Sequence, residues 1–206
     1  MVRLTSYGIK NNLDNDSGLV GQVKAYMEGV FNMKKWFRPV RVVKKYIDIV
    51  VNIRNILIAY LKASNHEIRI YQEKSIGTSI CDVMAVTDRL TGYEIKSDLD
   101  NYFRLAGQIK AYDRFFDENY LVVSKSHCQS AQYHVPNHWG ILCIENDNIT
   151  LFREALGNQQ VSRRNQLTIL WKLELKNLLV RNNMPLYAQR DRKYISEQLA
   201  STVEPG

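Results

Sequence analysis

Two short stretches decide the fold class of this chain: ICDVMAV at residues 80–86 and TGYEIKSD at residues 91–98. Both are rich in apolar and β-favouring residues, which is typical of strands. The first carries Asp82, and the second carries Glu94 with Lys96 two residues later. Side chains alternate between faces along a strand, so Glu94 and Lys96 are expected on one face and Ile95 on the other. If the stretches pair as a hairpin, Asp82 comes to lie beside Glu94.

This pairing would bring two carboxylates and an ammonium group to one point. Such a group can hold a hard divalent cation and orient a water against a phosphate. An acid in an apolar strand is costly to bury unless it has a partner or a metal. Two simpler interpretations stay open: Asp82 is an outward-facing acid on an edge strand, and Lys96 pairs on the surface with Asp98 or Asp100.

Hydrophobic periodicity around these stretches predicts an alternating order of elements. The N-terminal part reads as a loop to residue 17, a helix to about residue 37 and a break at Pro39. The predicted order from there is one helix or two over 41–63, strands at 67–73, 80–87 and 92–96, a helix at 105–116, a strand at 120–124, a hairpin of strands at 139–145 and 149–153, one long helix at 167–181 and a short helix at 193–202.

The spacing D-(x11)-E-x-K, formed by Asp82, Glu94 and Lys96, resembles the motif of the PD-(D/E)XK superfamily of restriction-endonuclease-like nucleases. Gln108 and Tyr112 in the following helix resemble the Q-x-x-x-Y element of its RecB-like branch. The likeness is to a small bacterial and phage branch and covers about residues 54–176.

The resemblance implies an α/β fold with a restriction-endonuclease-like αβββαβ core around a mixed central sheet. The implied organisation is a basic N-terminal helical extension at 1–40, a nuclease-like domain at 41–181 and a C-terminal tail at 182–206.

The resemblance also implies a metal site for Mg²⁺ or Mn²⁺. Asp82 and Glu94 would be its carboxylate ligands, and the backbone carbonyl of Ile95 would add a third. Glu73, at the end of the preceding strand, is a further candidate ligand or else a solvated strand end.

In the same resemblance, Lys96 places or deprotonates the attacking water and stabilises charge in the transition state. Gln108 and Tyr112 lie four residues apart on one helix face, so they can reach one spot. The resembled branch uses such residues to position the substrate phosphate or the lysine. The alternative for this pair is a core tyrosine beside a surface glutamine.

The 206-residue chain has a formal net charge of +7, and this excess lies ahead of the predicted site. Residues 1–62 hold 11 Lys and Arg against 4 Asp and Glu, whereas residues 63–206 hold 17 of each. A basic arm suits a nucleic-acid enzyme, because phosphate contacts supply most sequence-independent affinity. The alternative is a solvated helix face. The candidate nucleic-acid contacts are Lys34, Lys35, Arg38, Arg41, Lys44 and Lys45, with Arg104 near the predicted site.

Composition excludes several other classes. No stretch approaches the roughly 18 uncharged apolar residues of a spanning helix, so no membrane partner is expected. Three cysteines are too few and too scattered for a disulfide framework, which favours a cytoplasmic setting. Zinc is disfavoured because the spacing C-x5-H-x3-H-x4-C between Cys128 and Cys143 fits no common finger.

These observations lead to the hypothesis of a Mg²⁺-dependent phosphodiesterase that acts on DNA, with RNA as the less favoured substrate. Two other functions remain as alternatives: a non-catalytic module that binds nucleic acid or a protein on the same fold, and hydrolysis of a nucleotide second messenger by the same site. The sequence sets neither the oligomeric state nor the biological pathway.

Overall fold

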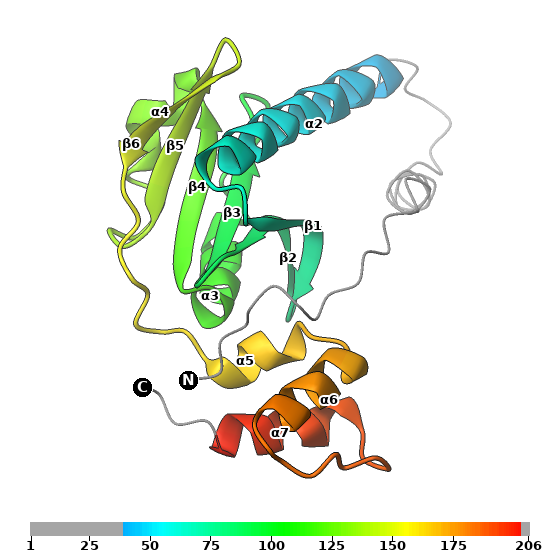
Figure 1. Ribbon diagram of the computed structural model, residues 1–206. Helices are drawn as coiled ribbons and strands as arrows, with labels where there is room; N and C mark the ends of the chain where they lie inside the picture. Colours follow the sequence, from blue (N-terminus) through cyan, green and yellow to red (C-terminus); the bar gives the residue numbers. More distant parts are fainter. Residues whose placement is uncertain (1–38, 203–206) are drawn as a thin grey trace.

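A six-stranded mixed sheet forms the centre of the protein, and the computed structural model describes residues 39–202 (Figure 1). The strands lie in their sequence order: β1 (Arg69–Ile76), β2 (Ser79–Val86), β3 (Leu90–Lys96), β4 (Glu118–Ser124), β5 (Gly140–Glu145) and β6 (Asn148–Arg153). The pairs β3–β4 and β4–β5 are parallel, and the other pairs are antiparallel. The predicted α/β class with a mixed sheet is therefore confirmed.

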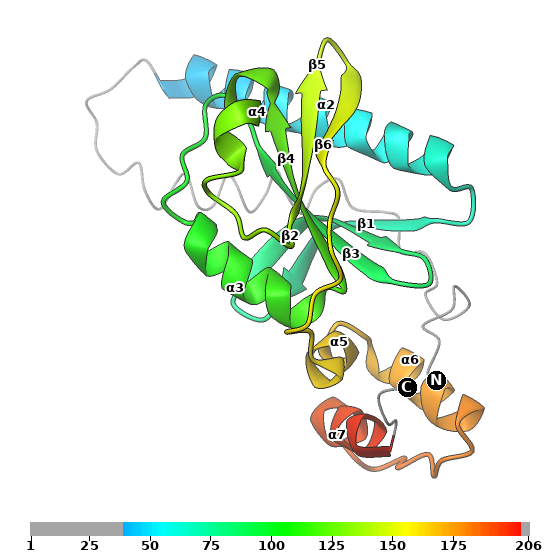
Figure 2. The same cartoon turned by 90° about the vertical axis from the view of Figure 1, so that its left-hand side faces the viewer.

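One face of the sheet is covered by the long helix α2 (Pro39–Ser64), which crosses the strands (Figures 1 and 2). Its buried residues Ile53, Leu57 and Leu61 pack on the side chains that the central strands turn to this face. Proline fits the first turn of a helix, because the N–H that it lacks has no partner there. Pro39 is accordingly the first residue of α2, and the helix expected up to about residue 37 falls outside the described residues.

The opposite face is covered by α3 (Leu105–Phe115), and α4 (Lys125–Ala131) packs near the ends of β4 and β5. Strand β4 shows why both faces can be covered: Leu121 and Val123 join the cluster under α3, whereas Val122 joins the cluster under α2. All three are fully buried, as expected for a central strand. Helix α4 was not predicted, because only Ala131 of its seven residues is buried and it shows no apolar stripe.

The chain ends in three helices, α5 (Arg163–Thr168), α6 (Lys172–Arg181) and α7 (Arg192–Thr202), which share a hydrophobic cluster of their own. The prediction of one long helix over 167–181 is wrong. Ile169 packs into the core under α3, but the next residue, Leu170, packs into the C-terminal cluster. The chain must bend between these two residues, because their side chains pack into different cores. After the bend, the carboxylate of Glu174 accepts a hydrogen bond from Trp171 N at the start of α6.

The expected absence of a disulfide framework does not hold for every cysteine, because Cys128 of α4 and Cys143 of β5 form a disulfide. Sequence spacing did not reveal it, because the parallel β4–β5 pairing is what brings them together. Within residues 39–202, no helix combines the length and apolar character needed to cross a membrane.

We predict that Gly92→Ala destabilises the protein by about 1–3 kcal/mol, because overpacking a rigid core costs that much. A Cβ at Gly92 would lie 2.3 Å from Phe116 Cδ2, and Phe116 is fully buried. Urea denaturation monitored by circular dichroism measures the change. The matched control is Gly107→Ala in α3, where a Cβ meets nothing within 4 Å. That control should gain about 0.5–1 kcal/mol from helix propensity; equal stability of the two variants would contradict the packing argument.

Candidate active site

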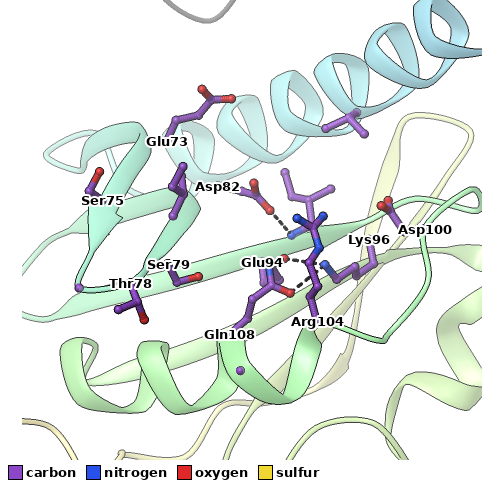
Figure 3. Close-up of a pocket in the computed structure, with 15 residues that line it drawn as sticks. Glu73, Ser75, Thr78, Ser79, Asp82, Glu94, Lys96, Asp100, Arg104 and Gln108 are labelled. Carbon is purple, nitrogen blue, oxygen red and sulfur yellow. Dashed lines mark hydrogen bonds and ion pairs between the residues drawn. The ribbon is translucent and has the colours of Figure 1, made fainter. Parts of the chain in front are cut away.

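Asp82 lies where β2 separates from β3. The ladder between these strands runs from Val86↔Leu90 to Val83↔Tyr93, and Asp82 is the next residue along β2. Its carboxylate takes the place of a backbone partner, because Oδ2 accepts a 2.8 Å hydrogen bond from Ile95 N. The side chain of Asp82 is thereby held against β3, within the cavity that Glu94 also lines (Figure 3).

Glu94 and Lys96 form an ion pair on the α3 face of β3. The Nζ atom of Lys96 lies 2.7 Å from Oε1 of Glu94, and these residues are only 5% and 2% exposed. Ile95 between them joins the opposite core, under α2. The predicted alternation of faces along this strand is confirmed. The surface pairing of Lys96 is not what the structure shows, since its ammonium group bonds within the site.

Helix α3 closes this ion pair with Gln108. Its amide oxygen accepts a 3.0 Å hydrogen bond from Lys96 Nζ, and its amide nitrogen donates to Oε1 of Glu94. The three side chains therefore form a closed ring of hydrogen bonds (Figure 3). Such a ring fixes the position of the ammonium group relative to the carboxylate.

Tyr112, one helical turn later, connects the two acids. Its hydroxyl donates to Oε2 of Glu94 at 2.7 Å and accepts from Asp82 N at 3.3 Å. The carbonyl oxygen of Tyr93 also lies 3.3 Å from this hydroxyl, but the single proton belongs to the closer carboxylate. The tyrosine is fully buried, so the core interpretation and the site interpretation both describe it.

Glu73 takes a different position. It lines the same cavity, but its carboxylate pairs with Arg54 of α2 at 2.9 Å, on the side of the site toward α2 (Figure 3). The same guanidinium lies 4.0 Å from Oδ1 of Asp82. Sequence reasoning did not assign Arg54 to the site, although a signal existed. It is a buried cation inside the apolar stripe of α2, and such a residue needs an acid to face.

The cavity around these residues has a volume of about 680 Å³. Arg104, the predicted phosphate contact, lines it at the start of α3 (Figure 3). The opposite wall is the β1–β2 hairpin, which contributes the hydroxyl groups of Ser75, Thr78 and Ser79. The cavity therefore joins acids, cations and hydroxyl donors, a combination suited to a phosphate ester with a cation.

The predicted basic arm lies largely beyond what the structure describes. Lys34, Lys35 and Arg38 fall outside the described residues. Arg41, Lys44 and Lys45 lie in the first turns of α2, where the backbone alone is described.

Burial raises the pKa of Asp82 to about 7, and the neighbouring charge of Glu94 adds to the rise. The hydrogen bond from Ile95 N and the charges of Arg54 and Lys96 oppose it. Burial likewise raises the pKa of the Cys81 thiol and of the Tyr112 hydroxyl. An acid in this state gains from a nearby cation, because a positive charge stabilises its ionised form.

The oxygen atoms that Asp82, Glu94 and Ile95 bring to this cavity are of the kind that a magnesium ion binds. Asp82 and Glu94 supply carboxylate oxygens, and Mg²⁺ is usually held by one or two carboxylates with waters completing its octahedron. The N–H and C=O of a strand residue point toward the same neighbouring strand, so the Ile95 carbonyl is directed to the Asp82 side, as its N–H is. In the described part of the chain, no group of three or more His, Cys, Asp or Glu side chains could hold a metal.

The candidate zinc residues are used elsewhere in the fold. Cys128 and Cys143 form the disulfide. Nε2 of His138 lies 2.9 Å from Oδ1 of Asp113, and the ring of His134 stacks on that of Tyr102.

Comparison with known proteins identifies a protein family that this chain matches. A family model described as bacteriophage P4 protein cII matches residues 47–205. Among solved structures, the chain is similar to the SPO1766 protein of unknown function from Silicibacter pomeroyi. That match has 16% identity and a TM-score of 0.41, and it covers 57% of this chain and 79% of the other. No curated protein matches the chain.

We predict that Asp82→Asn raises the melting temperature at pH 8 in the presence of EDTA. A carboxyl group whose folded pKa lies above its unfolded value makes folding less favourable as pH rises from about 4 through about 7. Asparagine can still accept from Ile95 N but carries no charge. Because 26% of the Asp82 side chain is exposed, water screens part of its charge. We therefore expect the free energy of unfolding to rise by about 1 kcal/mol and the melting temperature by about 2–4 °C.

The pH dependence separates this cause from a general stabilisation. The advantage of Asp82→Asn should shrink as the pH falls to about 4, because Asp82 is then protonated in the folded protein and neither protein carries a charge at this position there. The exposed acid Glu67 provides the matched control, Glu67→Gln, which should show no such trend. An advantage that is equal at pH 4 and pH 8 would contradict the assignment.

Proposed function

This chain belongs to the bacteriophage P4 protein cII family, and we propose that it is a metal-dependent nuclease that hydrolyses phosphodiester bonds of DNA. The element order from α2 to β4 is α-β-β-β-α-β around a mixed sheet, which supports a restriction-endonuclease-like core. The observation that carries the proposal is the convergence of Asp82, Glu94 and Lys96 in one cavity.

The reaction is the displacement of a sugar oxygen from phosphorus by water. The water oxygen forms a bond to phosphorus as the P–O bond to the sugar breaks. The water loses a proton and the leaving oxygen gains one. A bound Mg²⁺ would polarise the phosphate and make a bound water more acidic. Asp82, Glu94 and the carbonyl of Ile95 are the atoms that would hold the ion.

Lys96 is suited to position the water. An ammonium group has three N–H donors, and Lys96 uses two of them on Glu94 and Gln108. One donor is left for a water or a phosphate oxygen in the cavity that Lys96 lines. Gln108 and Tyr112 act as positioning residues, because they bond to Lys96 and Glu94 without offering a charge of their own.

The cavity wall and the charge of the chain support a nucleic acid as the substrate class. Arg104 and the hairpin hydroxyls offer donors to phosphate oxygens. The basic arm at 34–45 supplies affinity that does not depend on sequence. DNA is the favoured substrate and RNA the second.

One observation favours the alternative of a non-catalytic binding module. Arg54 already neutralises Glu73 and lies 4.0 Å from Asp82, so part of the negative charge has a cation within the protein. A module that uses arginine in place of a metal ion would bind nucleic acid and leave it intact. A DNA-cleavage assay with Mg²⁺ or with EDTA separates the two functions.

We predict that the protein cleaves plasmid or single-stranded DNA with Mg²⁺ or Mn²⁺ and not with EDTA. Asp82→Ala and Glu94→Ala should each lower the rate at least about 100-fold, because each removes a ligand of the ion. Gel electrophoresis of the products measures the rate. Lys110→Ala, on the exposed side of α3, is the control and should keep full activity. Activity retained in both acid variants would rule out the mechanism.

We also predict that millimolar Mg²⁺ raises the melting temperature of the wild-type protein. A ligand that binds only the folded state stabilises that state by RT ln(1 + [L]/Kd). This stabilisation is about 2.7 kcal/mol when the ligand concentration is a hundred times Kd. Asp82→Asn should lose most of this shift. Differential scanning fluorimetry with and without EDTA measures it. An equal shift in both proteins would place the ion elsewhere.

A further inference from the structure

A second cavity of about 470 Å³ adjoins the first one. The two cavities share Glu73, Ser75 and Gly77, so the β1–β2 hairpin forms a wall between them. The far wall of the second cavity comes from the junction of α5 and α6 and from the start of α7. Figure 1 shows these three helices beyond the end of this hairpin.

Two cations and an aromatic side chain line this second cavity. Lys74 of β1 and Arg192 of α7 face it from opposite walls, and Trp171 stands at the start of α6. Burial lowers the pKa of Lys74, the charge of Glu174 opposes this fall, and the charge of Arg192 adds a smaller lowering. Two cations that repel each other across a cavity gain when an anion enters.

Trp171 is 68% exposed, although tryptophan is a residue that proteins usually bury. An exposed indole ring beside two cations offers a base one face for stacking and its phosphate two charged partners. The surrounding helices fit this use, since residues 163–202 hold 8 Lys and Arg against 3 Asp and Glu. Residues 63–162, which contain the sheet, hold 9 Lys and Arg against 13 Asp and Glu.

We propose that the second cavity is a nucleotide subsite for single-stranded DNA, in which Trp171 stacks on a base and Lys74 and Arg192 contact phosphate. The bases of a duplex are stacked on each other, so a base must be unpaired to lay its face on Trp171. The inference rests on the proposed nuclease function. It makes the substrate a strand that runs from the catalytic cavity over the β1–β2 hairpin to the C-terminal helices.

The test measures binding without cleavage. Full-length Asp82→Asn protein in EDTA is titrated into fluorescent homothymidine oligonucleotides of about 4–16 nucleotides, a range that covers common single-strand site sizes. Trp171→Ala should weaken binding of the longer oligonucleotides about tenfold, whereas Trp171→Phe keeps an aromatic face and most of the affinity. Lys74→Gln with Arg192→Gln should reduce the salt dependence by about 0.7 log units of slope per lost contact.

Leu173→Ala is the matched control, because Leu173 is 69% exposed on the same helix and does not line the cavity. Equal affinity of Trp171→Ala and Leu173→Ala, with oligonucleotide binding intact, overturns the subsite and leaves the nuclease function standing. An equal effect of Trp171→Ala on blunt duplex also overturns it. If the parent protein binds no oligonucleotide, and the wild type cleaves none, the subsite and the proposed function both fall.

Discussion

The buried ion pair between Glu94 and Lys96 is the constraint on which the rest of the site depends. Two charges taken out of water are costly unless additional hydrogen bonds satisfy them. The backbone of β3 cannot provide these bonds, because its N–H and C=O groups lie in the plane of the sheet and the ion pair stands on the α3 face. Gln108 and Tyr112 supply them from α3. The helix must therefore lie on this face of the sheet with one particular side turned inward.

The separation of β2 from β3 is the second constraint. A continuous ladder would have filled the space beside Ile95 with backbone. Because the regular pairing stops at Val83, the carboxylate of Asp82 can reach Ile95 N and the Ile95 carbonyl stays directed at the opening. The local break in the sheet thus creates a place where side-chain and backbone oxygens can meet.

Charge balance in the site comes from both layers of the fold. α2 brings Arg54 to Glu73 and Asp82 from one side, while β3 brings Lys96 to Glu94 from the other. In these ion pairs three carboxylates face two cations, and the cavity wall adds Arg104 and Asp100, whose charges are opposite, so an excess of one negative charge is left. A divalent cation near Asp82 would offset that excess, and this balance is the electrostatic reason to expect one.

The sequence by itself determined the strand pattern, the shared face of Glu94 and Lys96, and the helix that carries Gln108 and Tyr112. These features depend on periods of 2 and 3.6 residues, which are local. Tertiary structure alone decided the partner of Glu73, the place of Arg54, the disulfide between Cys128 and Cys143, and the bend at Ile169–Trp171. Each of these depends on which distant surfaces meet in space, and no local spacing along a chain encodes that.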